Sequence, residues 1–276
     1  MQNDSLLTAS ANVARRQRFH CRRLLQLALV VLFAFTTIAQ AGDGNSTGPA
    51  DDGWTFSVSP YLWAAGIKGK TGTLPGLPAA DVDQSFSDIF DDLQFSGMLF
   101  WTARKDRFGI AGDLQYVETL AKDNALAPLF GREELSSKSF IASVVGEYLL
   151  YDDSRSVLRL SGGARLWSVD TELKLSTGLL PGTKIKGDKT WVDPVIGVSG
   201  VLDLGPKTFL RGWGYVGGFG VGSDFTADLF AGVGYRFTDS ISSTLGYRWV
   251  KVDYDSGDFL YDVRQEGIAT GLSFTF

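Results

Sequence analysis

The sequence predicts an all-β protein: an antiparallel up-and-down transmembrane β-barrel of about ten strands. The first observation is the closing decapeptide GIATGLSFTF. In it, Ile268, Leu272 and Phe274 share one face of an extended chain, and small or polar residues share the other. The second is that similar alternating segments recur along the chain, separated by connections that are in turn short and long. A transmembrane barrel turns the apolar face of each strand to lipid and ends its strands in aromatic girdles, as this pattern requires.

Each expected strand follows from this alternation and from the turn residues that interrupt it. We expect strands over 54–67, 93–105, 108–121, 138–151, 156–175, 184–203, 207–218, 225–237, 241–254 and 262–276. Compact polar or Gly/Pro turns are expected at 105–107, 152–155, 204–206 and 238–240, and longer connections at 68–92, 122–137, 176–183, 219–224 and 255–261. Bacterial barrels have short periplasmic turns and longer outer loops, so this order places both termini in the periplasm. Eight or twelve strands remain alternatives, because strand boundaries are the weakest part of such a prediction.

The assignment of faces is ambiguous in two places. Pro60 cannot donate to a ladder, so a bulge there would switch the faces of Tyr61 and Trp63. Further along, Trp213 shares its parity with Arg211, which mixes an aromatic and a charged side chain on one face. A soluble sandwich or a lipocalin-type barrel is the competing fold, but it would need a core for the outward aromatics of nearly every strand.

The N-terminal region predicts export. An arginine-rich region precedes the apolar run Leu24–Ile38, and Ala39–Ala41 offers the small residues that a signal peptidase reads. We therefore expect a signal peptide at 1–41, a flexible lead-in at 42–53 and the barrel at 54–276, in the outer membrane of a Gram-negative cell. An uncleaved membrane anchor is the alternative, although the apolar run is short for a span of about 20 residues.

Composition argues against several function classes. The formal net charge is −5, and removing the arginine-rich signal leaves a still more acidic chain. An acidic chain argues against binding of nucleic acid. His20 and Cys21 are the only histidine and cysteine, and both lie in the predicted signal. We therefore expect no catalytic residues, no metal site, no cofactor and no enzyme activity, because a serine or water nucleophile needs a nearby base. Asp253 and Asp255 are interpreted as part of a solvated acidic rim.

Charged residues gather on the polar parity of the strands. The residues expected to face the lumen are Arg104, Asp113, Glu147, Arg159, Arg165, Asp193, Arg211, Asp228, Arg236 and Arg248. Because a narrow barrel is largely filled by side chains, these groups must pair or meet water. One interpretation is a structural network of ion pairs that joins the walls. The other is a charged constriction in a narrow pore, where the excess of arginine would favour anions.

The longest predicted loop, 68–92, contains a helical pattern. Apolar residues at spacing i, i+3, i+4 and i+7 are Phe86, Ile89, Phe90 and Leu93. Ser85 or Ser87 would cap this short amphipathic helix, which we expect either to cover the barrel mouth as a lid or plug, or to bind an outside partner. The glycine-rich stretch 217–223 superficially suggests a nucleotide-binding loop, but a strand pattern follows it, and a tight outer hairpin explains the glycines better.

Stretches along the whole barrel region resemble a broad, mostly uncharacterised family of proteobacterial outer-membrane β-barrel proteins grouped with small OmpA-like barrels. The matching stretches are PYLWAAGIKG, DQSFSDIFDDLQF, GDLQY, WVDPVIG, GGFGVGSDF, GYRF, GYRW and the terminal GLSFTF. The resemblance implies insertion by the outer-membrane assembly machinery, which reads a C-terminal aromatic strand, here with Phe274 and Phe276 as the assembly signal. It implies no activity. Val117 and Glu118 depart from the apolar continuation expected after GDLQY.

We therefore predict a monomeric, porin-like membrane protein that serves as a structural component or a narrow passive pore. Its expected partners are outer-membrane lipid, lipopolysaccharide and the assembly machinery. The alternative is a surface-binding, adhesion-type barrel that acts through its outer loops, above all the 68–92 loop.

Overall fold

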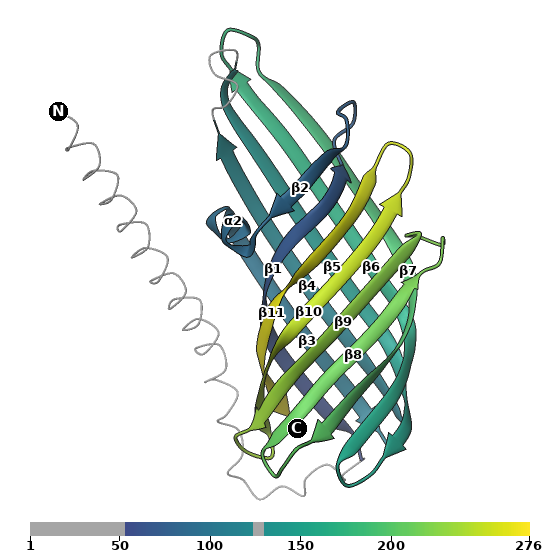
Figure 1. Cartoon of the computed structure of the whole chain (residues 1–276). Helices are drawn as coiled ribbons and strands as arrows, with labels where there is room; N and C mark the ends of the chain where they lie inside the picture. The colour runs from purple at the N-terminus through teal and green to yellow at the C-terminus, as the bar shows by residue number, and fades with distance from the viewer. Residues whose placement is uncertain (1–52, 124–129) are drawn as a thin grey trace, which may run out of the picture. The chain divides into compact units, whose positions relative to one another are not determined.

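Ten strands close into one antiparallel barrel in the computed structural model, which describes residues 53–123 and 130–276 (Figure 1). The strands of the wall are β1 (Thr55–Gly72), β3 (Leu93–Lys105), β4 (Phe108–Asp123), β5 (Phe130–Asp152), β6 (Ser156–Thr177), β7 (Thr183–Asp203), β8 (Thr208–Gly218), β9 (Phe225–Arg236), β10 (Ile241–Asp255) and β11 (Leu260–Thr275). Each strand pairs with its neighbour in the chain, and β11 pairs with β1. The predicted barrel is confirmed, whereas the predicted signal peptide and residues 42–52 of the lead-in lie outside the described residues.

The register of β1 is continuous through Pro60. Ser57 pairs with Thr275 and Tyr61 pairs with Gly271, so no residue is inserted between them. Trp63 is buried inside the barrel, and its neighbour Leu62 is 61% exposed on the outside. The bulge considered at Pro60 is therefore absent from β1, and Tyr61 and Trp63 keep the inward parity of the residues before them.

Strands β4 to β7 extend further than the sequence pattern indicated. The segment 122–137, expected to be a loop, is largely strand, because β5 begins at Phe130. Cross-strand ion pairs support the extension, with Lys122 Nζ 4.0 Å from one oxygen of Glu134 and Lys174 Nζ 3.9 Å from the other. These charged pairs replace the apolar alternation on which the strand assignment depended. Figure 1 shows β5, β6 and β7 rising beyond the other strands at the end that carries the longer loops.

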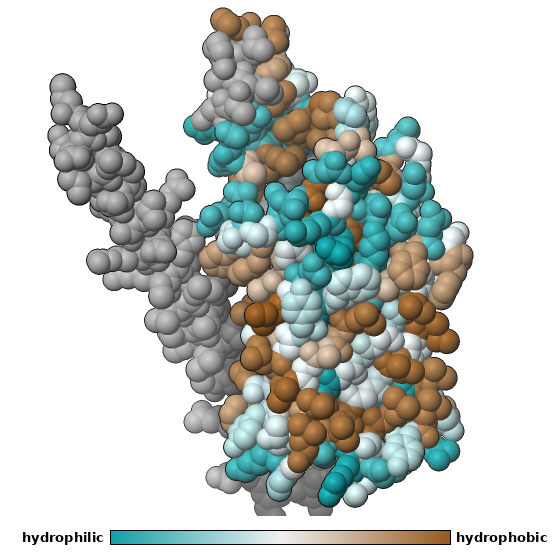
Figure 2. All heavy atoms as spheres, in the orientation of Figure 1, coloured by the Kyte–Doolittle hydropathy of each residue, from teal (hydrophilic) through white to brown (hydrophobic). Residues whose placement is uncertain are grey.

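The outer face of the barrel carries an apolar band. Leu245 and Ile268 are 60% and 57% exposed although both lie in mid-strand. On the face shown in Figure 2, hydrophobic side chains gather over the lower part of the wall, and hydrophilic ones gather toward the long-loop end. Soluble proteins rarely expose an apolar area of this kind to water. The band instead matches the lipid-facing zone of a membrane barrel. The described residues contain no helix that is both long and apolar enough to cross a membrane.

The 68–92 segment folds back onto the barrel. The short strand β2 (Ala80–Gln84) pairs with the outer end of β1, and the helix α2 (Phe86–Asp91) follows it. Ser85 caps the helix in a capping box with Asp88: the Asp88 N–H donates to the Ser85 hydroxyl, and the Ser85 N–H donates to the Asp88 carboxylate. The predicted helix is confirmed with a smaller extent, since Leu93 already belongs to β3.

Helix α2 lies where the pairing of the wall is interrupted. On the edge of β1 that faces away from β11, the ladder with β3 runs from Thr55–Arg104 to Pro60–Leu99. Pairing on this edge resumes only at Ile67, with β2. Gly66 lies between these two ladders, and a Cβ atom there would come within 2.9 Å of the Gln84 carbonyl oxygen. The close approach of β2 and α2 at this point therefore depends on glycine, and it lets the helix cover the gap in the described wall.

Candidate functional site

The interior of the barrel is divided into three zones along its axis. A cavity at the end with the short turns, here called the short-turn chamber, contains arginines and hydroxyl groups. A cluster of aromatic and aliphatic side chains fills the half near the long loops, here called the aromatic chamber. Between them lies the charged layer, which consists of Asp113, Arg165, Asp228 and Arg248. The lumen is thus polar only in part.

The charged layer is centred on Arg248 of β10. Its Nη2 lies 2.7 Å from Oδ2 of Asp113 on β4 and 2.6 Å from Oδ2 of Asp228 on β9. Arg165 of β6 places its own Nη2 2.6 Å from the same Oδ2 of Asp228. Asp228 is fully buried, and Arg248 is 2% exposed. Since β4 and β10 lie on different sides of the closed wall, these ion pairs cross the lumen.

Aromatic side chains complete the charged layer. Trp213 Nε1 donates to Oδ1 of Asp228 at 3.0 Å, and the Tyr61 hydroxyl donates to Oδ1 of Asp113 at 2.6 Å. Arg248 Nη1 in turn donates to the Tyr61 oxygen at 2.9 Å. Two cations face two carboxylates, and each charged group has partners within hydrogen-bond distance. Buried ion pairs need such a complete set of hydrogen-bond partners, because their attraction must offset a large desolvation cost.

The aromatic chamber is built mainly from packed rings. Trp191 stacks on Tyr254 with ring centroids 4.1 Å apart and on Trp167 at 5.9 Å. A cavity of about 180 Å³ also lies in this half, lined by side chains of α2, including Ile89 and Phe90, and by polar side chains of the wall. A narrow barrel fills its interior with side chains, and the buried cluster in this half is mainly apolar.

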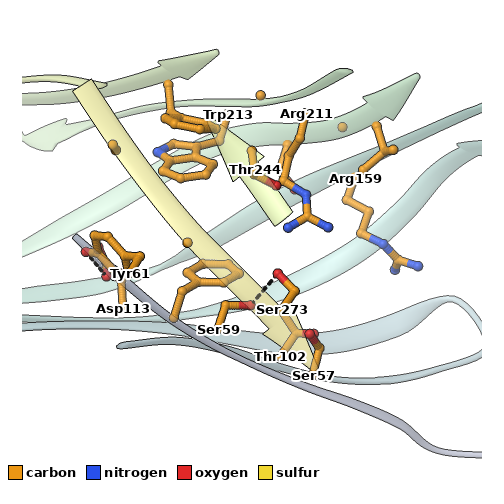
Figure 3. A pocket seen from close by; sticks show the side chains of 18 of the residues that line it. Ser57, Ser59, Tyr61, Thr102, Asp113, Arg159, Arg211, Trp213, Thr244 and Ser273 are labelled. Atoms are coloured by element: carbon orange, nitrogen blue, oxygen red, sulfur yellow. Dashed lines mark hydrogen bonds between the residues drawn. The ribbon is translucent and has the colours of Figure 1, made fainter. Parts of the chain in front are cut away.

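The short-turn chamber has a volume of about 130 Å³. Arg104, Arg159 and Arg211 line it together with small hydroxyl residues, and Figure 3 shows the guanidinium groups of Arg159 and Arg211 on the cavity side of the wall. Arg104 is held by Glu147, whose two oxygens accept hydrogen bonds from its Nε at 2.6 Å and its Nη2 at 3.1 Å. The chamber is therefore cationic at one end and close to the charged layer at the other.

Most of the predicted lumen charges face the interior, but they do not form one network. Asp113, Arg165, Asp228 and Arg248 form the layer, and the Arg104–Glu147 pair lies in the short-turn chamber. Arg236 pairs with Asp203 at 2.7 Å near the rim, where both side chains are about one-third exposed. The partners in each pair come from different strands, so sequence parity could indicate the common interior but not the partners.

Asp193 stands apart from the other predicted charges. Its carboxylate accepts hydrogen bonds from the Ser223 N–H at 2.6 Å and from the Ser223 hydroxyl at 2.8 Å. Trp191 Nε1 also donates to that hydroxyl at 2.8 Å. Asp193 therefore fastens the connection between β8 and β9 to the wall. In that connection Gly218 and Gly220 have φ of +85° and +74°, so the glycines serve a tight turn.

Two residues of the site were missed from the sequence. Trp213 and Tyr61 were treated as ambiguous or outward aromatics, yet both hydrogen-bond to carboxylates of the charged layer. The parity of these residues could have placed them inside, since Trp213 shares its face of the strand with Arg211. The expectation that aromatic side chains face lipid argued against this, but the barrel has aromatic side chains on both faces of its wall.

The barrel is similar to solved structures of bacterial outer-membrane proteins. The outer-membrane protease OmpT from Escherichia coli is 10% identical, with 84% of this chain and 99% of that chain covered and a TM-score of 0.49. The translocator domain of the autotransporter NalP from Neisseria meningitidis is also 10% identical, with 94% and 98% covered and a TM-score of 0.49. The attachment invasion locus protein Ail of Yersinia pestis is 11% identical, with 81% and 99% covered and a TM-score of 0.31.

No family model matches the chain, and no curated protein matches it. The similar structures are described as a protease, a translocator and an attachment protein, so they share a barrel and not an activity. At this level of identity the likeness concerns the fold alone, and function has to be argued from the lumen.

Proposed function

We propose that the chain is a Gram-negative outer-membrane β-barrel protein with a closed lumen, a membrane component rather than an open passive pore. The observation that carries this proposal is the charged layer. Of the two interpretations of the lumen charges, it favours the structural network over the conducting constriction. A constriction that selects ions presents charge to the ion, whereas Arg248 and Arg165 are already engaged by Asp113 and Asp228.

The barrier to conduction is energetic as well as steric. An ion that crossed the charged layer would have to displace hydrogen bonds between groups that are almost completely buried. Breaking one partner out of a buried pair costs on the order of several kcal/mol, because the other charge is left uncompensated. Beyond the layer, the stacked rings of Trp191 and Tyr254 occupy part of the lumen. The two barriers lie in series along the lumen.

The outward surface supports the proposed location. The apolar band on the wall suits lipid, and the ion-paired extension of β5–β7 suits water beyond it. Both ends of the barrel sequence lie at the short-turn end, where Phe56 and Phe276 exchange backbone hydrogen bonds of 3.1 and 2.9 Å. We place this end in the periplasm and assign Phe274 and Phe276 to the signal read by the assembly machinery. The proposal includes a monomer in contact with lipid and lipopolysaccharide, and it assigns no catalytic role.

The alternative of a surface-binding barrel retains one supporting observation. The β5–β7 extension presents a row of cross-strand charges at the long-loop end, with Lys184 Nζ 2.9 Å from Glu172 in addition to the pairs above. Helix α2 argues in the other direction, because Ile89 and Phe90 line the barrel's own cavity instead of an outside surface. The lid interpretation of this helix is therefore preferred to recognition of a partner.

Conductance of the refolded full chain in planar lipid bilayers tests the proposal. We expect no steady channel from the unaltered protein. The double variant Arg248→Ala/Asp228→Ala removes one cation and one anion, which leaves Arg165 and Asp113 balanced, and it should raise the frequency of channel openings. The matched control is Arg236→Ala/Asp203→Ala, which removes the pair at the rim, about one-third exposed, and should show no channel openings. A steady ohmic conductance of the unaltered protein would overturn the closed lumen.

A further inference from the structure

The short-turn chamber contains two arginines without an ion-pair partner in the described part of the chain. Neither Arg159 nor Arg211 forms an ion pair with any residue of 53–123 or 130–276. Glu147 attracts Arg159, but both of its oxygens already accept hydrogen bonds from Arg104. The Nη1 atom of Arg159 is buried and has no hydrogen-bond partner. Charged donors without an acceptor are costly, so this chamber is suited to an anion that the protein does not itself supply.

Part of the wall of the chamber is aromatic and fixed in position. Phe100 and Trp213 stack with ring centroids 5.9 Å apart and planes 1° apart, and Trp213 stacks on Phe230 at 4.2 Å. All three rings line the cavity. The hydrogen bond from Trp213 Nε1 to Asp228 holds the central ring in place. A flat ring entering the chamber would meet preformed aromatic surface, which favours offset stacking or edge contacts.

The volume of the chamber limits the size of the molecule. A cavity of about 150 Å³ engineered into another protein holds benzene, and the chamber measures about 130 Å³. The cavity is therefore suited to a single six-membered ring, and a small charged group on that ring would extend toward the short-turn end, where Arg159 and Arg211 lie. The Thr244 hydroxyl also lines the cavity and has no hydrogen-bond partner within the described part of the chain, so it is available to a polar atom of the molecule.

We propose that the short-turn chamber binds a small monocyclic aromatic carboxylate. Its carboxylate lies between Arg159 and Arg211, where guanidinium groups can donate in pairs, and its ring lies along Phe100 and Trp213. The molecule enters from the short-turn end, since Arg159 and Ser57 at the rim are partly exposed. This inference rests on the proposed closed lumen, because the charged layer forms the inner wall that retains the molecule.

Calorimetric titration of the full chain, refolded in detergent micelles, with benzoate as the probe tests this site. Benzoate should bind the unaltered protein, and Arg159→Gln/Arg211→Gln should weaken the binding by at least about tenfold, because charge-assisted hydrogen bonds are lost. The control Arg107→Gln/Arg155→Gln removes two equal charges at exposed turns and should leave the affinity unchanged. Circular dichroism will show whether the double variant folds. If it does not, the single variants Arg159→Gln and Arg211→Gln take its place in the titration.

Two further probes separate ring recognition from charge recognition. Acetate carries the charge without the ring, and benzyl alcohol carries the ring without the charge, so both should bind at least tenfold more weakly than benzoate. No benzoate binding, or binding that the Arg159 and Arg211 variants leave intact, overturns the site. Acetate binding as tightly as benzoate overturns the aromatic class of ligand. Conductance is measured separately in bilayers, so a channel without benzoate binding and benzoate binding without a closed lumen are distinguishable results.

Discussion

The two chambers of this barrel are built by the same strands, yet they have opposite chemistry. Along β10, the inward side chains change from the Thr244 hydroxyl to the Arg248 guanidinium and then to Val250, Val252 and Tyr254, all of which are buried. The short-turn chamber is a cavity of about 130 Å³ lined by arginines and hydroxyl groups, whereas the aromatic chamber is built from rings and aliphatic side chains beside a cavity of about 180 Å³. The difference shows that one inward-facing parity can specify several environments in series, with the charged layer as the boundary.

The boundary itself should be the most sensitive position. Replacing Asp228 with alanine removes a carboxylate that both Arg248 and Arg165 contact and leaves their buried charges poorly compensated. We expect the free energy of unfolding to fall by about 4 kcal/mol. Urea unfolding of the refolded barrel in lipid vesicles measures this loss. Asp203→Ala removes a partner of Arg236 that is 34% exposed and should cost less than about 1 kcal/mol. Equal losses at the two positions would show that the charged layer does not stabilise the fold in this way.

The aromatic chamber should depend on packing instead of charge. Trp191→Ala removes the ring that contacts both Trp167 and Tyr254, and we expect a loss of about 3 kcal/mol from the transfer term and the new cavity. The same urea unfolding measures this loss. The control is Leu179→Ala in the connection between β6 and β7, where the side chain is 74% exposed and the expected loss of stability is near zero. Benzoate affinity should stay unchanged in Trp191→Ala. A parallel loss of affinity would mean that the chambers are not independent.

The smallest expected effect concerns the helix that covers the aromatic chamber. The Ser85 hydroxyl and then the Ser85 N–H donate to the Asp88 carboxylate and hold the pKa of Asp88 below its ordinary value. A carboxyl with a lowered folded-state pKa contributes stability above its unfolded pKa, and that contribution disappears as the pH falls through the folded pKa. Hydrogen exchange at the Ile89 amide, corrected for intrinsic rates, should therefore lose protection in acid. Asp88→Asn should flatten this pH dependence, and protection that is equal in both proteins would contradict the role of the cap.

Local rules were sufficient for the wall of the barrel. Alternation with period two placed Leu245, Ile268 and Asp228 on the correct faces, because a strand turns successive side chains to opposite sides whatever lies beyond them. The helix α2 was also predictable, since its apolar spacing and its Ser85 cap are both local. The rules failed at 122–137, where β5 begins earlier than expected, because the ion pairs of Glu134 with Lys122 and Lys174 form only once β4, β5 and β6 are paired.

The sequence by itself therefore determined that the chain forms a barrel, which charged residues point inward and where the short turns lie, since each of these depends on neighbours along the chain. Only the tertiary structure decided which inward residues meet. Asp193 and Asp228 carry the same parity and the same charge, yet one holds a loop through Ser223 and the other joins Arg165 to Arg248 across the lumen. Closure of the sheet sets these partners, because the angular position and height of a side chain in a barrel depend on every strand between the two residues. The division into two chambers, and the arginines without partners in one of them, arise at that level.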